Sequence, residues 1–187
     1  MSAADPTVHA VTMSEPDDPQ PGLEEAKALL RDGFGRIRTE VPAVLDGLTE
    51  QQILWRADPS ANHIAWLVWH LSRQQDDQVA AIGNLTTVWQ DGWVDRLKLP
   101  YSPRASGYGM SAADVGAFPP VEPELLIGYQ DAVADMTIGV IDALDDFDRV
   151  VDRRWTPPVT AGVRLVSVVE DCAKHLGQAE FIRGMLV

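Results

Sequence analysis

The chain has 187 residues, of which 45% are hydrophobic and 23% are charged, and its formal net charge is −13. Its length and apolar content predict one globular domain with a sizeable core, whereas the acidic charge argues against nucleic acid and anionic lipid as partners. The single cysteine, Cys172, excludes an intramolecular disulfide, and the amino terminus lacks the pattern of a signal peptide. The most apolar run, residues 64–71, is too short to span a membrane. We therefore expect a protein of the reducing cytoplasm.

The amino-terminal segment and the first helix differ sharply in composition. Residues 1–21 hold four prolines and four acidic residues without one Lys or Arg, which predicts a disordered tail. The folded domain is then expected to span residues 22–187. From Leu23 onward, apolar residues recur every three or four positions, as in a helix. Pro42 is expected to interrupt this helix and Gly47 to end it.

A second long helix is expected in the next part of the chain. Thr49 and Gln52 have the spacing of a capping box, which predicts a short helical turn. Ser60 or Asn62 can then cap a helix that runs to about Trp89. We expect six tryptophans to serve mainly in packing.

The second half of the chain predicts two more helices. Residues 91–121 are rich in Gly and Pro and predict a long crossover, with a short turn starting at Ser111. A helix is expected at 123–144, where a proline occupies the favoured first turn, and another at 163–186 after Thr160. Four long helices without a convincing series of strands predict an all-α fold. The expected architecture is an antiparallel four-helix bundle with a long crossover between helices two and three.

Three residues on two of these helices could bind a metal ion. Asp171 and His175 are one turn apart on an otherwise apolar helix face. If the second helix faces the fourth, His70 joins them in a set of two histidines and one carboxylate, which leaves coordination positions open for water or substrate. His63 lies about 10.5 Å from His70 along the helix, too far to share the ion. Zinc is the first expectation, followed by nickel or iron(II).

These residues also have structural interpretations. A histidine on an apolar helix face is more often hydrogen-bonded in the core than a metal ligand. Asp171 and His175 can equally form a hydrogen bond within their helix. Asp76 and Asp77 are expected to be solvated. Cys172 is expected to be a small buried side chain rather than a nucleophile.

Two arginines flank the candidate ligands on the last helix. Arg164 lies two turns before Asp171, and Arg183 lies two turns after His175, roughly along the same side. Either arginine could bind an anionic part of a substrate. Surface ion pairing in an acidic protein is the alternative.

Three runs of sequence resemble the DinB-like superfamily, especially its actinobacterial mycothiol-transferase-like branch: "DGFGRIRTEVPAVLDGLTEQQILWRADPSANHIAWLVWHLSRQQDDQVAAI", "GYGMS" and "VTAGVRLVSVVEDCAKHLGQAEFIRGML". The resemblance covers about residues 32–186. It implies a four-helix bundle, often homodimeric, in which the second and last helices bind a divalent metal. His70 and His175 match the family's ligands. Asp171 stands where many relatives have histidine, and Met110 stands where similar "GYGHS" stretches have one.

The resemblance also implies a function. It indicates a metal-dependent thiol S-transferase in detoxification or stress, with mycothiol, bacillithiol or a similar thiol as cosubstrate and an electrophile as the second substrate. A divalent ion suits this chemistry because it lowers the pKa of a thiol and so produces a nucleophile. One alternative is a thiol-dependent isomerase similar to maleylpyruvate isomerase. Another is a non-catalytic metal-binding dimeric module.

Overall fold

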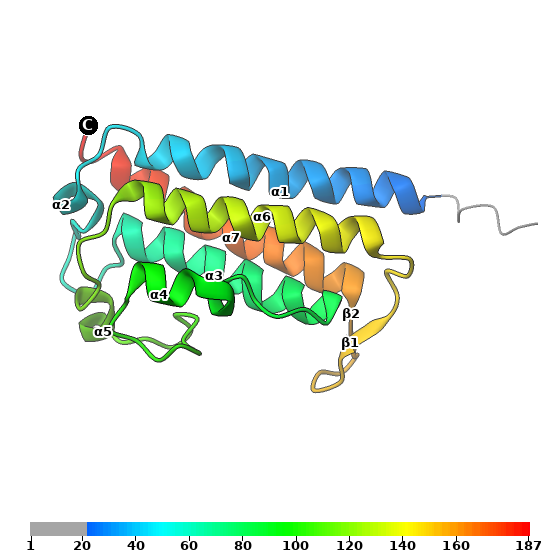
Figure 1. The fold of residues 1–187 in the computed structure, drawn as a ribbon. Helices are drawn as coiled ribbons and strands as arrows, with labels where there is room; N and C mark the ends of the chain where they lie inside the picture. Colours follow the sequence, from blue (N-terminus) through cyan, green and yellow to red (C-terminus); the bar gives the residue numbers. More distant parts are fainter. Residues whose placement is uncertain (1–21) are drawn as a thin grey trace, which may run out of the picture.

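The computed structural model describes residues 22–187 and consists mainly of four long helices (Figure 1). These helices are α1 (Leu23–Leu45), α3 (Ile64–Gly83), α6 (Pro123–Ala143) and α7 (Ala161–Arg183). The predicted all-α four-helix bundle with a long crossover is confirmed. The predicted tail at residues 1–21 lies outside the described residues.

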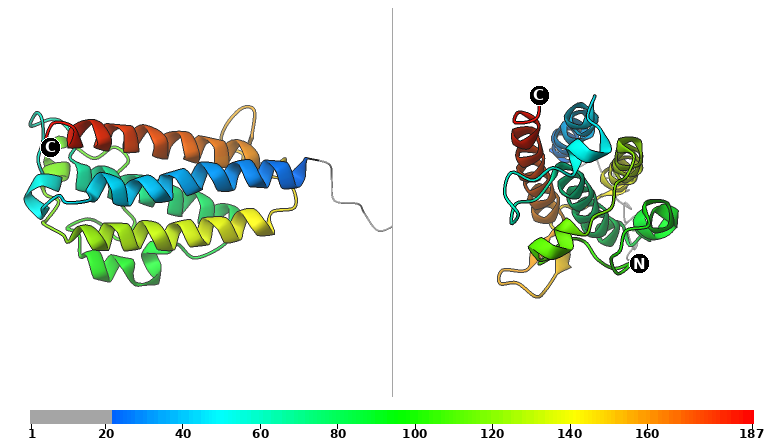
Figure 2. Two further views of the ribbon diagram at one scale, coloured as in Figure 1. Left: turned by 90° about the horizontal axis from the view of Figure 1, so that it is seen from above. Right: turned by 90° about the vertical axis from the view of Figure 1, so that its left-hand side faces the viewer.

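The four helices occupy the corners of a square when the bundle is viewed along its axis (Figure 2). α3 packs against α6 and α7, and α1 packs against the same two helices. The crossover returns the chain to the end of the bundle at which α3 begins, so α6 runs parallel to α3. The antiparallel neighbours are therefore α1 with α6 and α3 with α7.

Short helical elements occupy the connections. α2 (Glu50–Ile53) follows α1, and the crossover contains η1 (Trp89–Trp93), α4 (Val94–Leu97) and α5 (Ala112–Gly116). Thr49 caps α2 through the predicted capping box, and Ser111, where a short turn was predicted to start, caps α5 through a second capping box. The crossover is thus a series of short turns that packs along the outside of the bundle.

The start of α3 differs from the prediction. His63, rather than Ser60 or Asn62, is the N-cap, and its Nδ1 accepts a hydrogen bond of 3.1 Å from the backbone N–H of Trp66. The Nε2 atom of His63 lies 3.0 Å from the carbonyl oxygen of Val115, to which it donates. Both nitrogens of this buried histidine are therefore engaged in holding the structure together.

One helix boundary and one helix interruption were also predicted wrongly. α3 ends at Gly83 rather than near Trp89, because Asn84 adopts a left-handed conformation with φ 52°. α1 continues through Pro42 to Leu45 instead of being interrupted. A proline removes only one backbone donor, and packing of the buried face of α1 retains the helix around it.

A small β-hairpin connects α6 to α7, in a segment for which no strand was predicted. Strand β1 (Val150–Asp152) pairs antiparallel with β2 (Val159–Thr160). Strands of three and two residues are too short to produce an alternating pattern in the sequence. Asp152 accepts a hydrogen bond of 3.0 Å from Arg164, which ties the hairpin to the first turns of α7.

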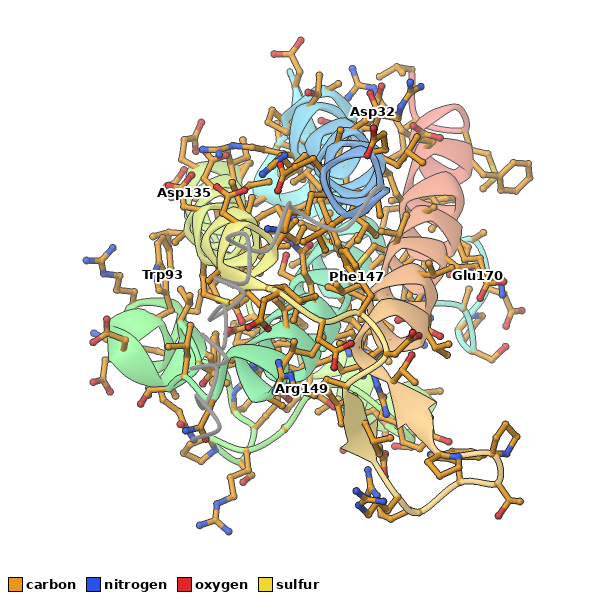
Figure 3. All side chains as sticks on the ribbon, turned by 90° about the vertical axis from the view of Figure 1, so that its right-hand side faces the viewer. Asp32, Trp93, Asp135, Phe147, Arg149 and Glu170 are labelled. Carbon is orange, nitrogen blue, oxygen red and sulfur yellow. The ribbon has the colours of Figure 1, made fainter. Side chains whose placement is uncertain are left out.

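The core fills the space between the four helices. Seen from the end at which the hairpin lies, Asp32, Asp135 and Glu170 surround the bundle, and Phe147 lies over its middle (Figure 3). Cys172 is fully buried, as predicted, and burial raises the pKa of its thiol far above the ordinary value. Among residues 22–187, no helix combines the length and apolar character that crossing a bilayer requires.

A buried polar cluster on α3 corrects the prediction that Asp76 and Asp77 are solvated. Asp76 is fully buried and accepts hydrogen bonds from the backbone N–H groups of residues 88 and 89 at 2.9 and 2.8 Å. It also accepts from the Tyr129 hydroxyl at 2.8 Å and from Arg73 at 3.3 Å. Only Asp77 reaches the surface, and it too binds Arg73. This cluster fastens the start of the crossover to the bundle.

Candidate metal centre

His70 on α3 meets Asp171 and His175 on α7 where these antiparallel helices pack together. One nitrogen of each imidazole and one carboxylate oxygen lie within 4.8 Å of one another. The two imidazole rings meet edge to face with their centroids 4.7 Å apart. Nε2 of His175 lies 3.7 Å from Oδ1 of Asp171, too far for the hydrogen bond that was the alternative interpretation of this pair. The structure thus brings together the three residues selected from the sequence.

The surroundings of His70 fix which of its nitrogens is available. Nδ1 lies 2.5 Å from the carbonyl oxygen of Ser106, so Nδ1 carries the proton and donates it. The indole ring of Trp66 stacks on the imidazole at 4.6 Å between centroids. Burial lowers the pKa of His70, and the ring is therefore neutral near pH 7. The lone pair of Nε2 is left free for a ligand.

The loop after Ser106 approaches His70 very closely. Gly107 has a φ of +93°, and a Cβ atom at this position would collide with Nδ1 of His70. Glycine is the residue that tolerates both this backbone conformation and this approach. The "GYGM" stretch therefore contributes to the site through the backbone that holds His70.

His175 is oriented by a neighbour on its own helix. Its Nδ1 atom lies 3.1 Å from Oε1 of Gln178, an arrangement in which the ring donates and the amide oxygen accepts. The Nε2 atom then faces Asp171 and His70. Side-chain exposure is 19% for His175 and 40% for Asp171, so solvent and small molecules can reach these two groups.

The donor set fits a divalent cation. Around a tetrahedral zinc ion with bonds of about 2.0–2.2 Å, neighbouring ligand atoms lie roughly 3.4 Å apart. Small side-chain rotations would bring the three atoms, now within 4.8 Å, to this separation. In metal-binding histidines the second ring nitrogen typically donates to a protein acceptor, and Ser106 and Gln178 provide such acceptors here.

The three side chains open into a cleft of about 590 Å³ between α3, α7 and the loop at residues 107–110. Along α3, Gln78 donates to Gln74 at 3.1 Å, and Gln74 donates to the hydroxyl of Ser106 at 3.3 Å. This polar row leads away from His70 towards the β-hairpin. A second cavity, lined in part by the same two glutamines, continues the cleft in that direction.

The structure separates the two arginines that the sequence placed near the site. Arg164 lines the continuation of the cleft, where it donates to Gln78 at 2.7 Å and pairs with Asp152. Arg183 instead donates to the carbonyl oxygens of Val44 and Asp46, at the end of α1. It is engaged there in capping another helix and does not line the cleft.

Sequence reasoning missed four residues that shape the centre. Trp66 was assigned to packing in general, while Ser106, Gly107 and Gln178 were given no role. Gln178 had a usable signal, since it lies three residues after His175 on the same helix face. The backbone contact of Ser106 had none, because irregular loops have no periodicity that predicts their contacts.

The fold and the site define a four-helix-bundle protein with a candidate metal centre of two histidines and one carboxylate. A comparison with protein families matches residues 29–186 to the mycothiol-S-transferase family. The chain belongs to this family. Comparison with curated proteins gave no match.

A solved structure supports the fold assignment. The chain is similar to a conserved protein from Enterococcus faecalis, whose crystal structure superposes with a TM-score of 0.78. The two sequences are 26% identical, and the alignment covers 84% of this chain and 94% of the other. The bundle is therefore shared over nearly its full length.

Proposed function

We propose that the protein is a metal-dependent S-transferase that joins a low-molecular-weight thiol of the mycothiol type to an electrophile. One observation carries the proposal. One nitrogen of each imidazole and one carboxylate oxygen lie within 4.8 Å of one another, while Ser106 and Gln178 engage Nδ1 of the two rings. Membership of the mycothiol-S-transferase family supports a thiol as one substrate. Zinc suits the donor set best, with nickel and iron(II) as alternatives.

The side chains of the centre have distinct roles in this proposal. A bound divalent cation supplies the positive charge that lowers the pKa of a thiol. His70 and His175 bind as neutral rings, and Asp171 contributes a negative charge that offsets part of the cation's charge. In the reaction the thiol releases its proton to solvent and its sulfur forms a bond to the electrophilic carbon. The leaving group departs with the electron pair of the bond that breaks.

The polar continuation of the cleft suits the body of such a thiol. Gln74 and Gln78 line it, and the exposed rings of Tyr108 and Trp155 flank it. Amide groups can hydrogen-bond to hydroxyls, and aromatic faces can pack on the apolar faces of sugar rings. We place the polar body of the thiol here, with its sulfur directed towards His70. Trp155 would then bind substrate rather than serve in packing.

Metal analysis tests the centre directly. The purified wild-type protein should bind one divalent ion per chain, and His175→Ala and Asp171→Ala should lose it. Asp171→His should retain the ion, because histidine is also a competent ligand at this position. Glu180→Ala changes an exposed residue of the same helix and serves as the control. Equal metal content in the wild type and in His175→Ala would exclude His175 as a metal ligand.

Turnover separates the transferase from its alternatives. With mycothiol and monobromobimane, the wild-type protein should form the conjugate faster than the uncatalysed reaction, and His175→Ala should not. Thiol-dependent isomerisation of maleylpyruvate without conjugate formation would indicate the isomerase. Bound metal without either reaction would indicate the non-catalytic module.

A homodimer and a location in the cytoplasm belong to the same proposal. The single cysteine and the reduced thiol substrate support a reducing compartment. Sedimentation equilibrium of the full chain tests the dimer, which should have twice the mass of the 20.5 kDa chain.

A further inference from the structure

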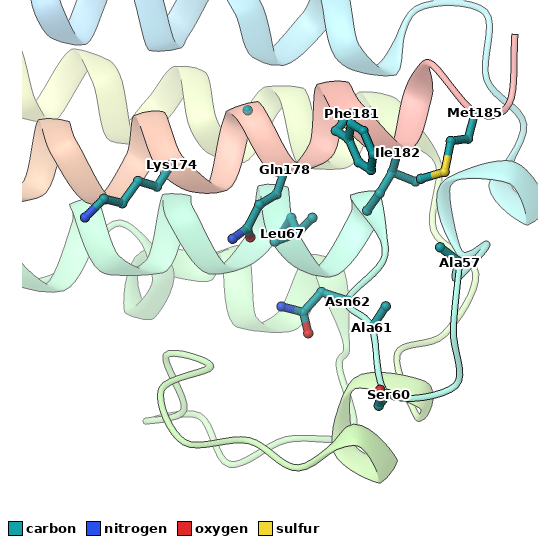
Figure 4. A pocket seen from close by; sticks show the side chains of 11 residues that line it. Ala57, Ser60, Ala61, Asn62, Leu67, Lys174, Gln178, Phe181, Ile182 and Met185 are labelled. Atoms are coloured by element: carbon teal, nitrogen blue, oxygen red, sulfur yellow. The ribbon is translucent and has the colours of Figure 1, made fainter.

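A further cavity, which is mainly apolar, lies on the side of the candidate metal centre opposite the polar continuation of the cleft. It has a volume of about 590 Å³ and lies between the last turns of α7 and the segment that precedes α3 (Figure 4). Most of its wall is apolar: Ala57, Ala61, Leu67, Phe181, Ile182 and Met185. Phe181 is 72% exposed and Met185 is 45% exposed. An apolar concave wall with two large accessible side chains is typical of a small-molecule site.

This apolar cavity is continuous with the cleft of the metal centre. Asn62 lines both, and Gln178, which lines the apolar cavity, accepts the hydrogen bond from His175. Phe181 follows His175 by six residues, which is about 9 Å along the helix. Six residues also turn the helix by roughly 240°, so a molecule that packs against Phe181 would reach the centre past Asn62 and Gln178.

The two sides of the centre differ in what they can bind. Towards the hairpin, the cleft presents the amides of Gln74 and Gln78 and the guanidinium of Arg164. Towards the carboxyl terminus, it presents mainly hydrocarbon and the ring of Phe181. Although Ser60, Asn62, Lys174 and Gln178 also line the apolar cavity, a ligand with an apolar body would gain more there than a wholly polar one. Two unlike substrates would each find a suitable surface.

From this arrangement we infer that the apolar cavity binds the electrophilic substrate, a small molecule with an aromatic or aliphatic body beside the reacting carbon. The inference rests on the proposed transferase function and adds the class of its second substrate. The apolar body packs between Phe181, Met185 and Leu67. The reacting carbon then points towards Asn62 and His175, where the thiol sulfur arrives from the polar side. A sulfur–carbon bond forms there, and the leaving group is released with its electron pair.

Two electrophiles with the same reacting carbon test this inference. Both 2-chloroacetamide and N-benzyl-2-chloroacetamide lose chloride to a thiol, and only the second carries an aromatic body. With mycothiol at saturation, the wild-type enzyme should show a KM for the benzyl compound at least about tenfold lower. Phe181→Ala should raise that KM about fivefold to tenfold and leave the KM for mycothiol unchanged. Equal KM values for the two compounds would contradict the inference.

A matched control is available on the same helix. Val166 on α7 is 62% exposed and lines none of the cavities described, so Val166→Ala should alter neither KM. Phe181→Leu retains an apolar side chain and should recover part of the loss. Because both positions are exposed, the variants should fold, which circular dichroism can verify.

Binding of an unreactive analogue separates this inference from the proposed function. N-benzylacetamide has no leaving group, and its binding by NMR titration needs neither metal nor thiol. It should bind the wild-type protein and Val166→Ala equally, and Phe181→Ala at least about fivefold more weakly. This result without any thiol transfer would support the apolar cavity as a ligand-binding site and would refute the proposed transferase function. No binding to the wild type, or equal binding to Phe181→Ala, would overturn the inference. Conversion of a dimer to a monomer by Phe181→Ala, without binding of the analogue, would instead assign the cavity to an interface between copies.

Discussion

Two polar clusters share helix α3, one turn apart, and they use their hydrogen-bonding groups differently. In the cluster of Arg73, Asp76 and Tyr129, the carboxylate of Asp76 receives donors from two backbone amides, a hydroxyl and a guanidinium. In the candidate metal centre, by contrast, His70 has a partner only at Nδ1 among residues 22–187. His70 and Asp76 are both buried, so burial alone does not distinguish these two side chains. What distinguishes them is whether their hydrogen-bonding groups all find partners within the chain.

The strongest test of this comparison is Asp76→Ala. The substitution leaves several buried donors without an acceptor, and we expect it to lower the free energy of unfolding by about 3–5 kcal/mol. Urea unfolding monitored by circular dichroism measures this loss. His175→Ala should change the free energy of unfolding by less than about 1 kcal/mol, because the partly exposed side chain of His175 makes few hydrogen bonds within the chain. A similar loss in both variants would show that the two clusters play the same structural role.

A second test concerns His63, the N-cap of α3, and uses the pH dependence of stability. Burial lowers the pKa of His63 to about 4, whereas the unfolded chain has an ordinary histidine pKa near 6.5. Between these values the unfolded state binds more protons, so stability falls as the pH falls. We expect His63 to account for a loss of about 2 kcal/mol between pH 7 and pH 5.

The variant His63→Asn isolates this contribution. Asparagine is a good N-cap but does not titrate in this range. Urea unfolding at pH 7 and pH 5 should therefore show a pH-dependent loss about 2 kcal/mol smaller in the variant than in the wild type. An unchanged pH dependence would contradict the low pKa of His63.

A third test disturbs the metal centre through a backbone contact. Gly107→Ala introduces a Cβ against His70 and strains a residue at φ +93°, so we expect a loss of about 1–2 kcal/mol in stability. The displaced ring should also bind metal at least about tenfold more weakly. Gly109→Ala is the control, because Gly109 has a φ of +73° but its Cβ would meet no atom within 4 Å. It should show the strain without the loss of metal, as measured by titration calorimetry.

The smallest expected effect on stability belongs to Gln178→Ala. Its amide accepts from His175 at an accessible position, so its loss should change the free energy of unfolding by less than about 0.5 kcal/mol. Metal affinity should nevertheless fall about tenfold to a hundredfold, since the ring loses the acceptor that orients it. Competition with a chromophoric chelator measures this change. Unaltered affinity would mean that Gln178 has no part in the centre.

The sequence predicted the helices and the triad because both depend on local spacing. Residues Asp171 and His175 face the same way on any helix. The spacing along the second helix favoured His70 over His63, and the resemblance agreed with that choice. The burial of Asp76 was not predictable in this way, because adjacent aspartates look solvated and the partners of Asp76 come from the crossover and α6. The contacts of Arg183 were unpredictable for a related reason. Its helix face was correct, but the nearby end of α1 offers it acceptors that no local pattern reveals.

The long crossover contributes more than a link between two helices. Ala105 accepts a hydrogen bond from Arg73, and Ser106 accepts one from His70, so adjacent carbonyls of the crossover are held by the two clusters of α3. If the candidate centre binds a metal ion as proposed, metal binding and ordering of this segment would be coupled equilibria, each favouring the other. Amide hydrogens around residues 104–110 should therefore exchange more slowly once zinc is added. The protection of this surface segment would then report whether the candidate centre holds a metal ion.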